Sequence, residues 1–144
     1  MAETRDVVER STTAFNAHDE DAIRANYAEN VVFTAPGDVE LQGADAATEY
    51  AMSWLRAFPD AKLTVHNTLE DGSWAAVQFT FAGTHTETLA SPEGDIPATN
   101  REVSGRGSEL VRVEGGKIAE EHLYYDQVQV LTQLGLMPAP AATA

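Results

Sequence analysis

The segment 117–128 carries the side chains of this sequence that are best suited to acid–base chemistry. Apolar and polar residues alternate along it, which is typical of a β-strand whose successive side chains point to opposite faces of a sheet. A carboxylate that faces an apolar interior without a partner has a raised pKa, and it can then remove a proton from carbon near neutral pH. Asp126 is therefore a candidate general base. Counting by two from Ile118 predicts one polar face made of Glu120, His122, Tyr124 and Asp126.

Asp126 also has a purely structural interpretation. Aspartate is among the residues preferred at helix N-caps, and residues 127–134 could form a short helix directly after it. The residues by themselves support the catalytic and the capping interpretation equally.

Two of the four histidines, His85 and His122, are further candidate catalytic residues. Histidine titrates near physiological pH and is the usual proton shuttle. We expect His85 to share a face with Phe79 and Phe81, although a buried histidine bonded to the backbone is the more frequent case. His122 lies about 13 Å from Asp126 at a rise of ~3.3 Å per residue, so both can line one wall without sharing a proton.

Aromatic side chains supply candidate walls for a ligand cavity, because binding pockets are generally lined by them. Tyr50 and Trp54 fall on one helical stripe, for which packing in the core is the plainer interpretation. Tyr27, Tyr124 and Tyr125 could donate a hydrogen bond to an enolate, or could serve only in packing. The full set of candidate substrate-binding residues is Tyr27, Phe33, Tyr50, Trp54, Phe79, Phe81 and Tyr124.

The composition excludes several classes of function. The chain has 144 residues, 9 Lys plus Arg against 23 Asp plus Glu, and a formal charge of −14, which argues against a nucleic-acid partner. The lack of cysteine excludes thiol catalysis, and the spacing of the histidines does not indicate a metal site. No apolar run approaches the ~18–20 residues of a membrane span, so we predict a cytoplasmic protein without a membrane partner.

The hydrophobic pattern predicts helices that are followed by long strands. Helical periodicity covers residues 3–17, 19–28 and 43–58, with Asp19 as a cap of the second helix and Pro59 at the end of the third. Hairpin turns are expected at Asp71-Gly72 and Gly115-Gly116. This order indicates an α+β fold. Strands are expected at about 31–35, 62–69, 73–86, 101–113 and 117–128.

The predicted sheet, which is mostly antiparallel, must curve to enclose a cavity. Gly105 and Gly107 allow a long strand to bend, so that the sheet wraps over the helices as a cone with an open end. The loop 87–100 is too long for a simple turn and is placed to border that opening. We predict a single domain over residues 1–137 and a flexible tail over residues 138–144.

Several segments, taken in order, resemble the SnoaL-like polyketide cyclases, a family within the nuclear transport factor 2-like superfamily of α+β cones. The likeness extends over nearly the whole chain. Two features depart from the family pattern: Glu87 stands where members often carry glycine, and the loop 89–95 is longer and more acidic. The segments are Gly83-Thr84-His85-Thr86-Glu87, residues 96–101, Gly116-Lys117-Ile118, Glu120-Glu121-His122, Tyr125-Asp126 and Gln133-Leu134-Gly135-Leu136.

This resemblance implies an enzyme that closes a ring of a small, hydrophobic, polyketide-like substrate by intramolecular aldol condensation, without metal or organic cofactor. It implies that Asp126, which matches a late aspartate of the family, is the acid/base residue. His85 and His122 would then be pocket residues that orient or polarise the substrate. Two other functions stay open: a dehydratase or isomerase on the same cone, and a non-catalytic small-ligand-binding protein.

The resemblance also implies a homodimer or a larger homo-oligomer that pairs through the outer face of the sheet. Leu110 and Arg112, or Leu123 and Tyr125, could furnish that surface. The other interpretation is that these are single apolar residues on the ordinary solvent-exposed face of a strand.

Overall fold

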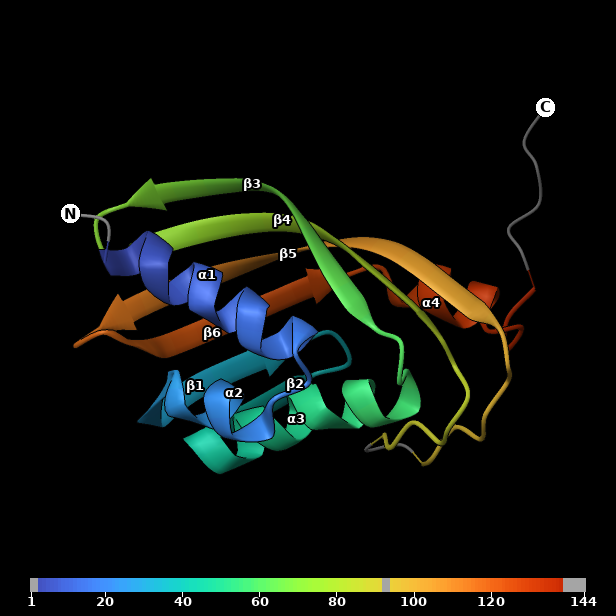
Figure 1. Cartoon of the computed structure of the whole chain (residues 1–144). Coiled ribbons are helices and arrows are strands. Elements are labelled where there is room, and N and C mark those ends of the chain that lie inside the picture. Colours follow the sequence, from blue (N-terminus) through green and yellow to red (C-terminus); the bar gives the residue numbers. More distant parts are fainter. Residues whose placement is uncertain (1–2, 92–93, 139–144) are drawn as a thin grey trace.

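Three helices lie on the concave face of a strongly curved sheet (Figure 1). The computed structural model describes residues 3–91 and 94–138. The three helices are α1 (Glu3–Asn16), α2 (Glu20–Ala25) and α3 (Ala44–Ala57), and a fourth, α4 (Gln127–Gln133), lies at the far end of the sheet. The predicted α+β architecture with a curved, mostly antiparallel sheet is confirmed.

The sheet has six strands in the order β2-β1-β6-β5-β4-β3. β1 and β6 are parallel, and all other neighbours are antiparallel. The sequence pattern did not predict β2, since its four residues are too few for the alternation to stand out. The strands are β1 (Tyr27–Ala35), β2 (Val39–Gln42), β3 (Lys62–Asp71), β4 (Trp74–Thr84), β5 (Glu102–Glu114) and β6 (Lys117–Tyr125).

The helices bury the apolar stripes that the sequence predicts. Val7 and Val8 of α1 and Leu55 of α3 are at most 3% exposed. The side chain of Asp19 accepts a hydrogen bond of 3.1 Å from the amide of Ala22, which confirms it as the cap of α2. The apolar stripes attach the helices to the sheet, so the concave face is closed along one side.

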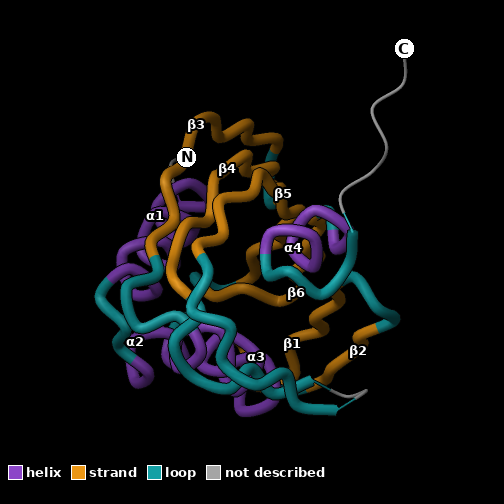
Figure 2. Tube along the Cα trace, turned by 90° about the vertical axis from the view of Figure 1, so that its right-hand side faces the viewer, coloured by secondary structure: helices purple, strands orange, loops and turns teal. Residues whose placement is uncertain are grey.

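Glycine permits close packing where β4 and β5 pair. Gly107 lies opposite Phe79, and a Cβ atom at Gly107 would come within 2.8 Å of the Phe79 ring. Only glycine lets that ring lie over the strand and turn into the concave face. A view onto the end of the molecule shows the strands curling around the space beside α3 and α4 (Figure 2).

The connection between β4 and β5 is held against the end of α3. Leu89 and Ile96 form an antiparallel bridge with backbone hydrogen bonds of 2.9 and 2.8 Å. The amides of Thr86 and Glu87 both donate to the carbonyl oxygen of Ala57. Residues 92–93 and 139–144 lie outside the described residues, so the predicted tail falls almost entirely there. The boundaries of the single domain stay a prediction.

Candidate active site

The space between the helices and the sheet contains a cavity of about 120 Å³, which we call the acid chamber. Its walls come from α1, α2, α3 and five of the strands. Three polar side chains in these walls, Tyr27, Glu109 and Glu121, come from β1, β5 and β6. Aromatic rings make up much of the remaining wall: Phe15, Phe33, Tyr50, Trp54, Phe79, Phe81 and Tyr125.

Glu109 and Glu121 form a hydrogen-bonded pair of carboxyl groups in the wall of the acid chamber. Two carboxyl groups can be hydrogen-bonded to each other only when one of them carries a proton. The hydroxyl group of Tyr27 donates a further hydrogen bond of 3.0 Å to Oε1 of Glu121. Glu121 is 7% exposed and Glu109 is half-buried, so the pair is largely shielded from bulk solvent.

The environment separates the two carboxyl groups into an acid and a base. Burial raises the pKa of Glu109 well above its ordinary value of 4.5, and the charge of Glu121 and the hydrogen bond between them raise it further. Burial also raises the pKa of Glu121, but its hydrogen bonds with Glu109 and Tyr27 and the nearby His122 act in the opposite direction. Glu109 therefore keeps its proton to higher pH than Glu121, and Glu121 is the first of the pair to ionise.

Glu121 faces the acid chamber because β6 contains a β-bulge. The pairing of β5 with β6 shifts between Arg112 and Val113, which leaves Ala119 without a partner. This extra residue reverses the alternation, so that Ile118 and Glu121 both point inward. Counting by two from Ile118 gives the outer face instead. The prediction of an interior polar face is therefore wrong for its four members, Glu120, His122, Tyr124 and Asp126.

Glu109 is a further chamber residue that the sequence reasoning missed, and Tyr125 is one that it placed on the opposite face of its strand. Glu109 is in phase with the buried Val111 and Val113 of the same strand. An acidic residue that continues a buried alternation was the signal that could have identified it. Tyr125 lies on the inward face of β6 only because of the bulge, which no feature of the sequence indicates.

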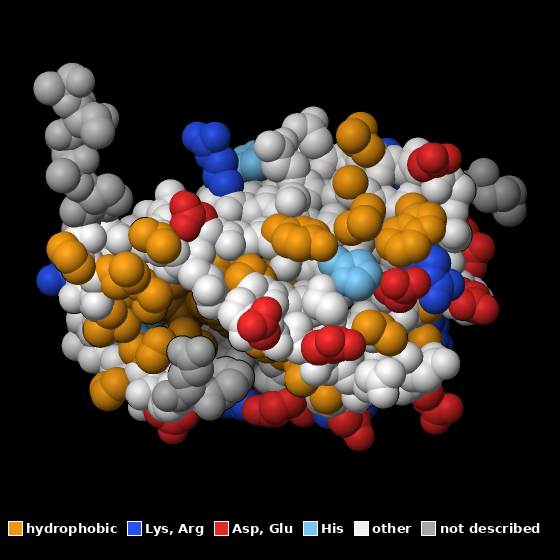
Figure 3. All heavy atoms as spheres, turned by 180° about the vertical axis from the view of Figure 1, so that it is seen from behind, with side chains coloured by type: hydrophobic (Ala, Val, Ile, Leu, Met, Phe, Trp, Pro, Cys, Tyr) orange, Lys and Arg blue, Asp and Glu red, His pale blue; other side chains and the backbone are white. Residues whose placement is uncertain are grey.

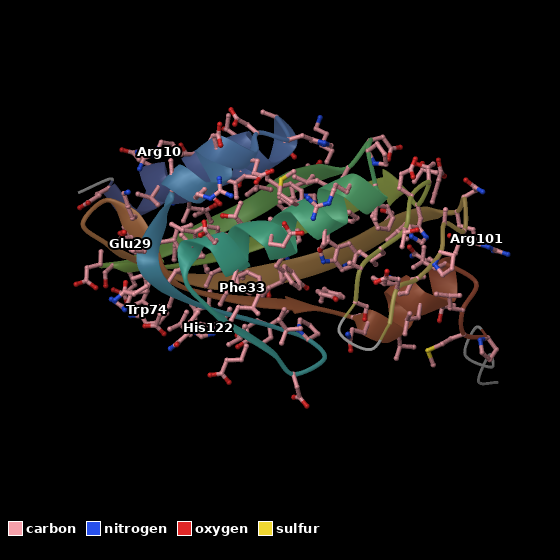
Figure 4. The ribbon with its side chains drawn as sticks, turned by 90° about the horizontal axis from the view of Figure 1, so that it is seen from below. Arg10, Glu29, Phe33, Trp74, Arg101 and His122 are labelled. Carbon is pink, nitrogen blue, oxygen red and sulfur yellow. The ribbon has the colours of Figure 1, made fainter. Side chains whose placement is uncertain are left out.

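Neither candidate histidine lines the acid chamber. His85 is fully buried, its ring stacks on Phe58 at 5.2 Å, and its Nδ1 accepts a hydrogen bond of 3.2 Å from the amide of Thr99. His85 thus anchors the β4–β5 connection, which corrects the prediction that it faces the cavity. His122 lies on the outer face of the sheet, in hydrogen-bond contact with Thr34 at 2.7 Å and Glu120 at 3.2 Å (Figure 4).

Most of the aromatic residues predicted to bind substrate do line the acid chamber. Phe33 lies beside α3, where its ring packs 4.8 Å from the ring of Tyr50 (Figure 4). Tyr124 is 56% exposed on the outer face, and its predicted place in the cavity is wrong. The residues placed correctly are Tyr27, Phe33, Tyr50, Trp54, Phe79 and Phe81.

One side of the acid chamber is closed by Tyr50, Trp54 and Tyr125, which we call the aromatic divider. The rings of Trp54 and Tyr125 meet edge to face, with centroids 5.7 Å apart. The hydroxyl group of Tyr50 is hydrogen-bonded to Trp54 and to Tyr125, and Tyr125 is also hydrogen-bonded to Gln127. Burial raises the pKa of both tyrosines, so their hydroxyl groups stay neutral and can donate hydrogen bonds.

No group of three or more His, Asp or Glu side chains in the described residues could hold a metal ion. Within the same part of the chain, none of the helices has the length and hydrophobicity needed to span a membrane.

Comparison with known proteins identifies the family. Residues 5–134 match the family described as SnoaL-like polyketide cyclase. The chain belongs to this family. It is similar to the aklanonic acid methyl ester cyclase DnrD of Streptomyces peucetius, with 30% identity over 141 residues that cover 94% of this chain and 92% of DnrD.

Solved structures of SnoaL-like and related proteins have the same fold. AclR from Streptomyces galilaeus, to which a hydroxylase activity is attributed, has a TM-score of 0.81 and 25% identity over 98% of this chain and 86% of AclR. A SnoaL-like polyketide cyclase from Jannaschia sp. CCS1 has a TM-score of 0.83 and 18% identity over 95% of this chain and 94% of its own. The second comparison concerns the fold alone.

Asp126, to which the resemblance assigns the acid/base role, lies outside the acid chamber of this SnoaL-like protein. Its side chain is exposed and accepts a hydrogen bond of 3.0 Å from the amide of Gln129, which caps α4. The capping interpretation is thus confirmed, and the expectation of a buried Asp126 is wrong. The carboxyl groups that do lie inside are those of Glu109 and Glu121.

Proposed function

We propose that this SnoaL-like protein catalyses the ring closure of a small, uncharged, polyketide-like carbonyl compound, with Glu121 as the base and Glu109 as the acid. The observation that supports it is the hydrogen-bonded pair of carboxyl groups in an apolar chamber. The proposal needs neither a metal nor an organic cofactor, and it includes the predicted cytoplasmic location.

The reaction we propose is an intramolecular aldol condensation in which the protons balance. The Glu121 carboxylate takes a proton from a carbon next to a carbonyl group, and the broken C–H bond leaves an enolate. The enolate carbon forms the new C–C bond with a second carbonyl carbon of the same molecule, whose oxygen takes the proton of Glu109. A proton then moves from Glu121 to Glu109 along their hydrogen bond. The starting pair is restored, and no atom of the substrate is lost.

The chamber contributes to this reaction in two ways. Its mostly apolar walls lower the local dielectric constant, which strengthens the attraction between a developing enolate and nearby donors such as the hydroxyl groups of Tyr27 and Tyr50. They also hold the two reacting carbons close to each other, and such proximity can supply about 7–11 kcal/mol of the barrier. Neither contribution requires a further chemical group.

Turnover of aklanonic acid methyl ester, the compound in the name of DnrD, tests the proposal. Glu121→Gln removes the base and is expected to lower kcat by about 10²–10⁴-fold. Glu109→Gln removes the acid and is expected to lower kcat as well. The matched control is Glu102→Gln, which removes the same charge from an exposed position of β5. Circular dichroism verifies that each variant is folded.

The product of the reaction decides between the possible functions. Cyclisation gives an isomer of equal mass, whereas dehydration gives a product that lacks water, and mass spectrometry with chromatography separates them. Unchanged turnover in both Glu121→Gln and Glu109→Gln would refute the proposed roles. Saturable binding of the ester without turnover by the wild-type protein would support a non-catalytic binding function instead.

We also propose that the protein forms a homodimer through the outer face of the sheet. Leu110 and Tyr124 are 40% and 56% exposed there, and hydrophobic side chains are visible on this face (Figure 3). The other pair that the sequence suggested, Leu123 and Tyr125, lines the acid chamber and is not part of this surface. Light scattering of the wild-type protein and of Leu110→Glu tests this, since the charge should shift a dimer toward monomer.

A further inference from the structure

A second hollow, of about 260 Å³, lies outside the acid chamber, and we call it the outer hollow. It is bounded by α4, by the β4–β5 connection and by the turn between β1 and β2, which surround the open end of the cone (Figure 2). Hydrophobic side chains gather around a hollow at this end of the molecule (Figure 3). Among the described residues that line it none is charged, and they include Val39, Leu89, Ile96, Val130, Leu131 and Leu134.

The outer hollow adjoins the acid chamber, because the two spaces share lining residues. Tyr50, Trp54 and Tyr125, the aromatic divider, line both spaces. A change of side-chain rotamer can therefore join the two spaces without moving a strand or a helix. The polar atoms of the divider are hydrogen-bonded to one another. A ligand that separates these side chains therefore meets hydroxyl groups that can donate hydrogen bonds to its oxygen atoms.

The acid chamber is too small for a ligand of several rings. Its volume is about 120 Å³, and a closed cavity of about 150 Å³ in another protein holds one benzene molecule. A ligand of two or more fused rings that presents one end to Glu109 and Glu121 must therefore extend past the divider. The outer hollow is the adjoining space, and it is the larger of the two.

The charges of the molecule restrict the ligand further. The chamber lining includes two acidic side chains, Glu109 and Glu121, against one basic and exposed side chain, Arg106, and the whole chain carries a formal charge of −14. A ligand carboxylate would be repelled by Glu121 and would lose its hydration in an apolar space. The end that enters the chamber is therefore a neutral carbonyl group, such as an ester or a ketone.

We propose that the outer hollow is a second ligand subsite. It takes the uncharged, apolar ring portion of a molecule whose neutral carbonyl end lies beside Glu109 and Glu121, and the aromatic divider parts to admit that molecule. This assignment of the carbonyl end rests on the proposed function, whereas binding in the outer hollow does not depend on turnover.

Binding of small esters to single-tryptophan variants tests the second subsite. The chain has two tryptophans, and Trp74→Phe leaves Trp54 of the divider as the fluorescent reporter. The ligands are methyl 1-hydroxy-2-naphthoate, which has two rings, the corresponding free acid, and methyl salicylate, which has one ring. In this background Val130→Phe fills the outer hollow from α4, and Val128→Phe is the matched control, since Val128 is 48% exposed and does not line the hollow.

Filling the outer hollow should weaken binding of the two-ring ester by about tenfold or more, because the second ring loses its apolar contacts. Binding of methyl salicylate should be unchanged, and Val128→Phe should affect neither ester. Ala90→Phe fills the hollow from the opposite wall at an exposed position, so it gives the same test without a core substitution.

Equal affinity of all three variants for the two-ring ester would overturn the subsite, as would failure of the wild-type protein to bind that ester. Binding of the free acid as tightly as the ester would overturn the requirement for a neutral end. These results are distinguishable from failure of the proposed function, because Glu121→Gln can lose turnover while the ester still quenches Trp54.

Discussion

Replacement of Glu109 by glutamine tests the protonation state on which the proposed chemistry depends. Glutamine has nearly the size of the neutral acid and can still donate a hydrogen bond to Glu121, but it does not titrate. The pKa of Glu109 is raised in the folded protein, so above its ordinary value of 4.5 the folded state keeps a proton that the unfolded state releases. The free energy of unfolding of the wild-type protein must therefore fall as the pH rises through this window.

The size of the effect follows from linkage. While the pH lies between 4.5 and the raised pKa of Glu109, the wild-type protein loses up to about 1.4 kcal/mol of stability per pH unit through this group. Glu109→Gln lacks this loss. It should therefore become progressively more stable than the wild-type protein as the pH is raised above 4.5 toward the raised pKa of Glu109.

Urea denaturation at several pH values measures the difference between the two stability curves. Glu102→Gln makes the same substitution at an exposed position of the same strand, and it should follow the wild-type curve. Curves of Glu109→Gln and wild type that run parallel over the whole pH range would show that Glu109 is ionised in the folded protein. The assignment of an acid and a base to the pair would then be wrong.

Three further predictions concern single residues. Asp126→Asn should keep both turnover and stability, because asparagine caps helices as well as aspartate does. Asp126→Ala should lower the free energy of unfolding in urea by about 1 kcal/mol. Loss of turnover in Asp126→Asn would return the acid/base role to that residue. Gly107→Ala should lower stability by about 1–3 kcal/mol, since its Cβ would press on the ring of Phe79, and a thermal melt equal to that of the wild type would contradict this packing. Burial lowers the pKa of His85, so the unfolded state binds the proton first and stability is lost as the pH falls below 6.5. His85→Gln should reduce this loss, and thermal melts at neutral and acidic pH, compared with those of the wild type, test it.

The sequence predicted the order of the elements well and the chemistry of the cavity poorly. Long periodic segments identified α1, α3 and the strands that pair in hairpins, because their apolar stripes are long enough to outweigh local exceptions. The aromatic wall followed from the same stripes. The sequence analysis assigned the wrong carboxyl group to the cavity, because one unpaired residue, Ala119, inverts the alternation of β6. Such a bulge depends on how β6 pairs with β5, which the residues of β6 alone do not encode.

Asp126 illustrates a second limit of the sequence. The residue stands at the junction of a strand and a short helix, where an exposed cap and a buried base use the same side chain. The choice between them depends on the direction in which β6 ends relative to the cavity, which is a property of the assembled sheet. Glu109, in contrast, lies in phase with the buried Val111 and Val113, and this alternation can be read from the sequence alone.

The place of β6 in the sheet has a consequence for how the protein is made on the ribosome. β6 lies between β1 and β5, and it joins the strands of the first half of the chain to those of the second. Tyr27 and Glu121, which are 94 positions apart, can meet only after this strand has emerged and inserted. A nascent chain that ends before residue 117 would leave β1 and β5 with open edges. Completion of the carboxyl pair and closure of the sheet are therefore a single late event in synthesis.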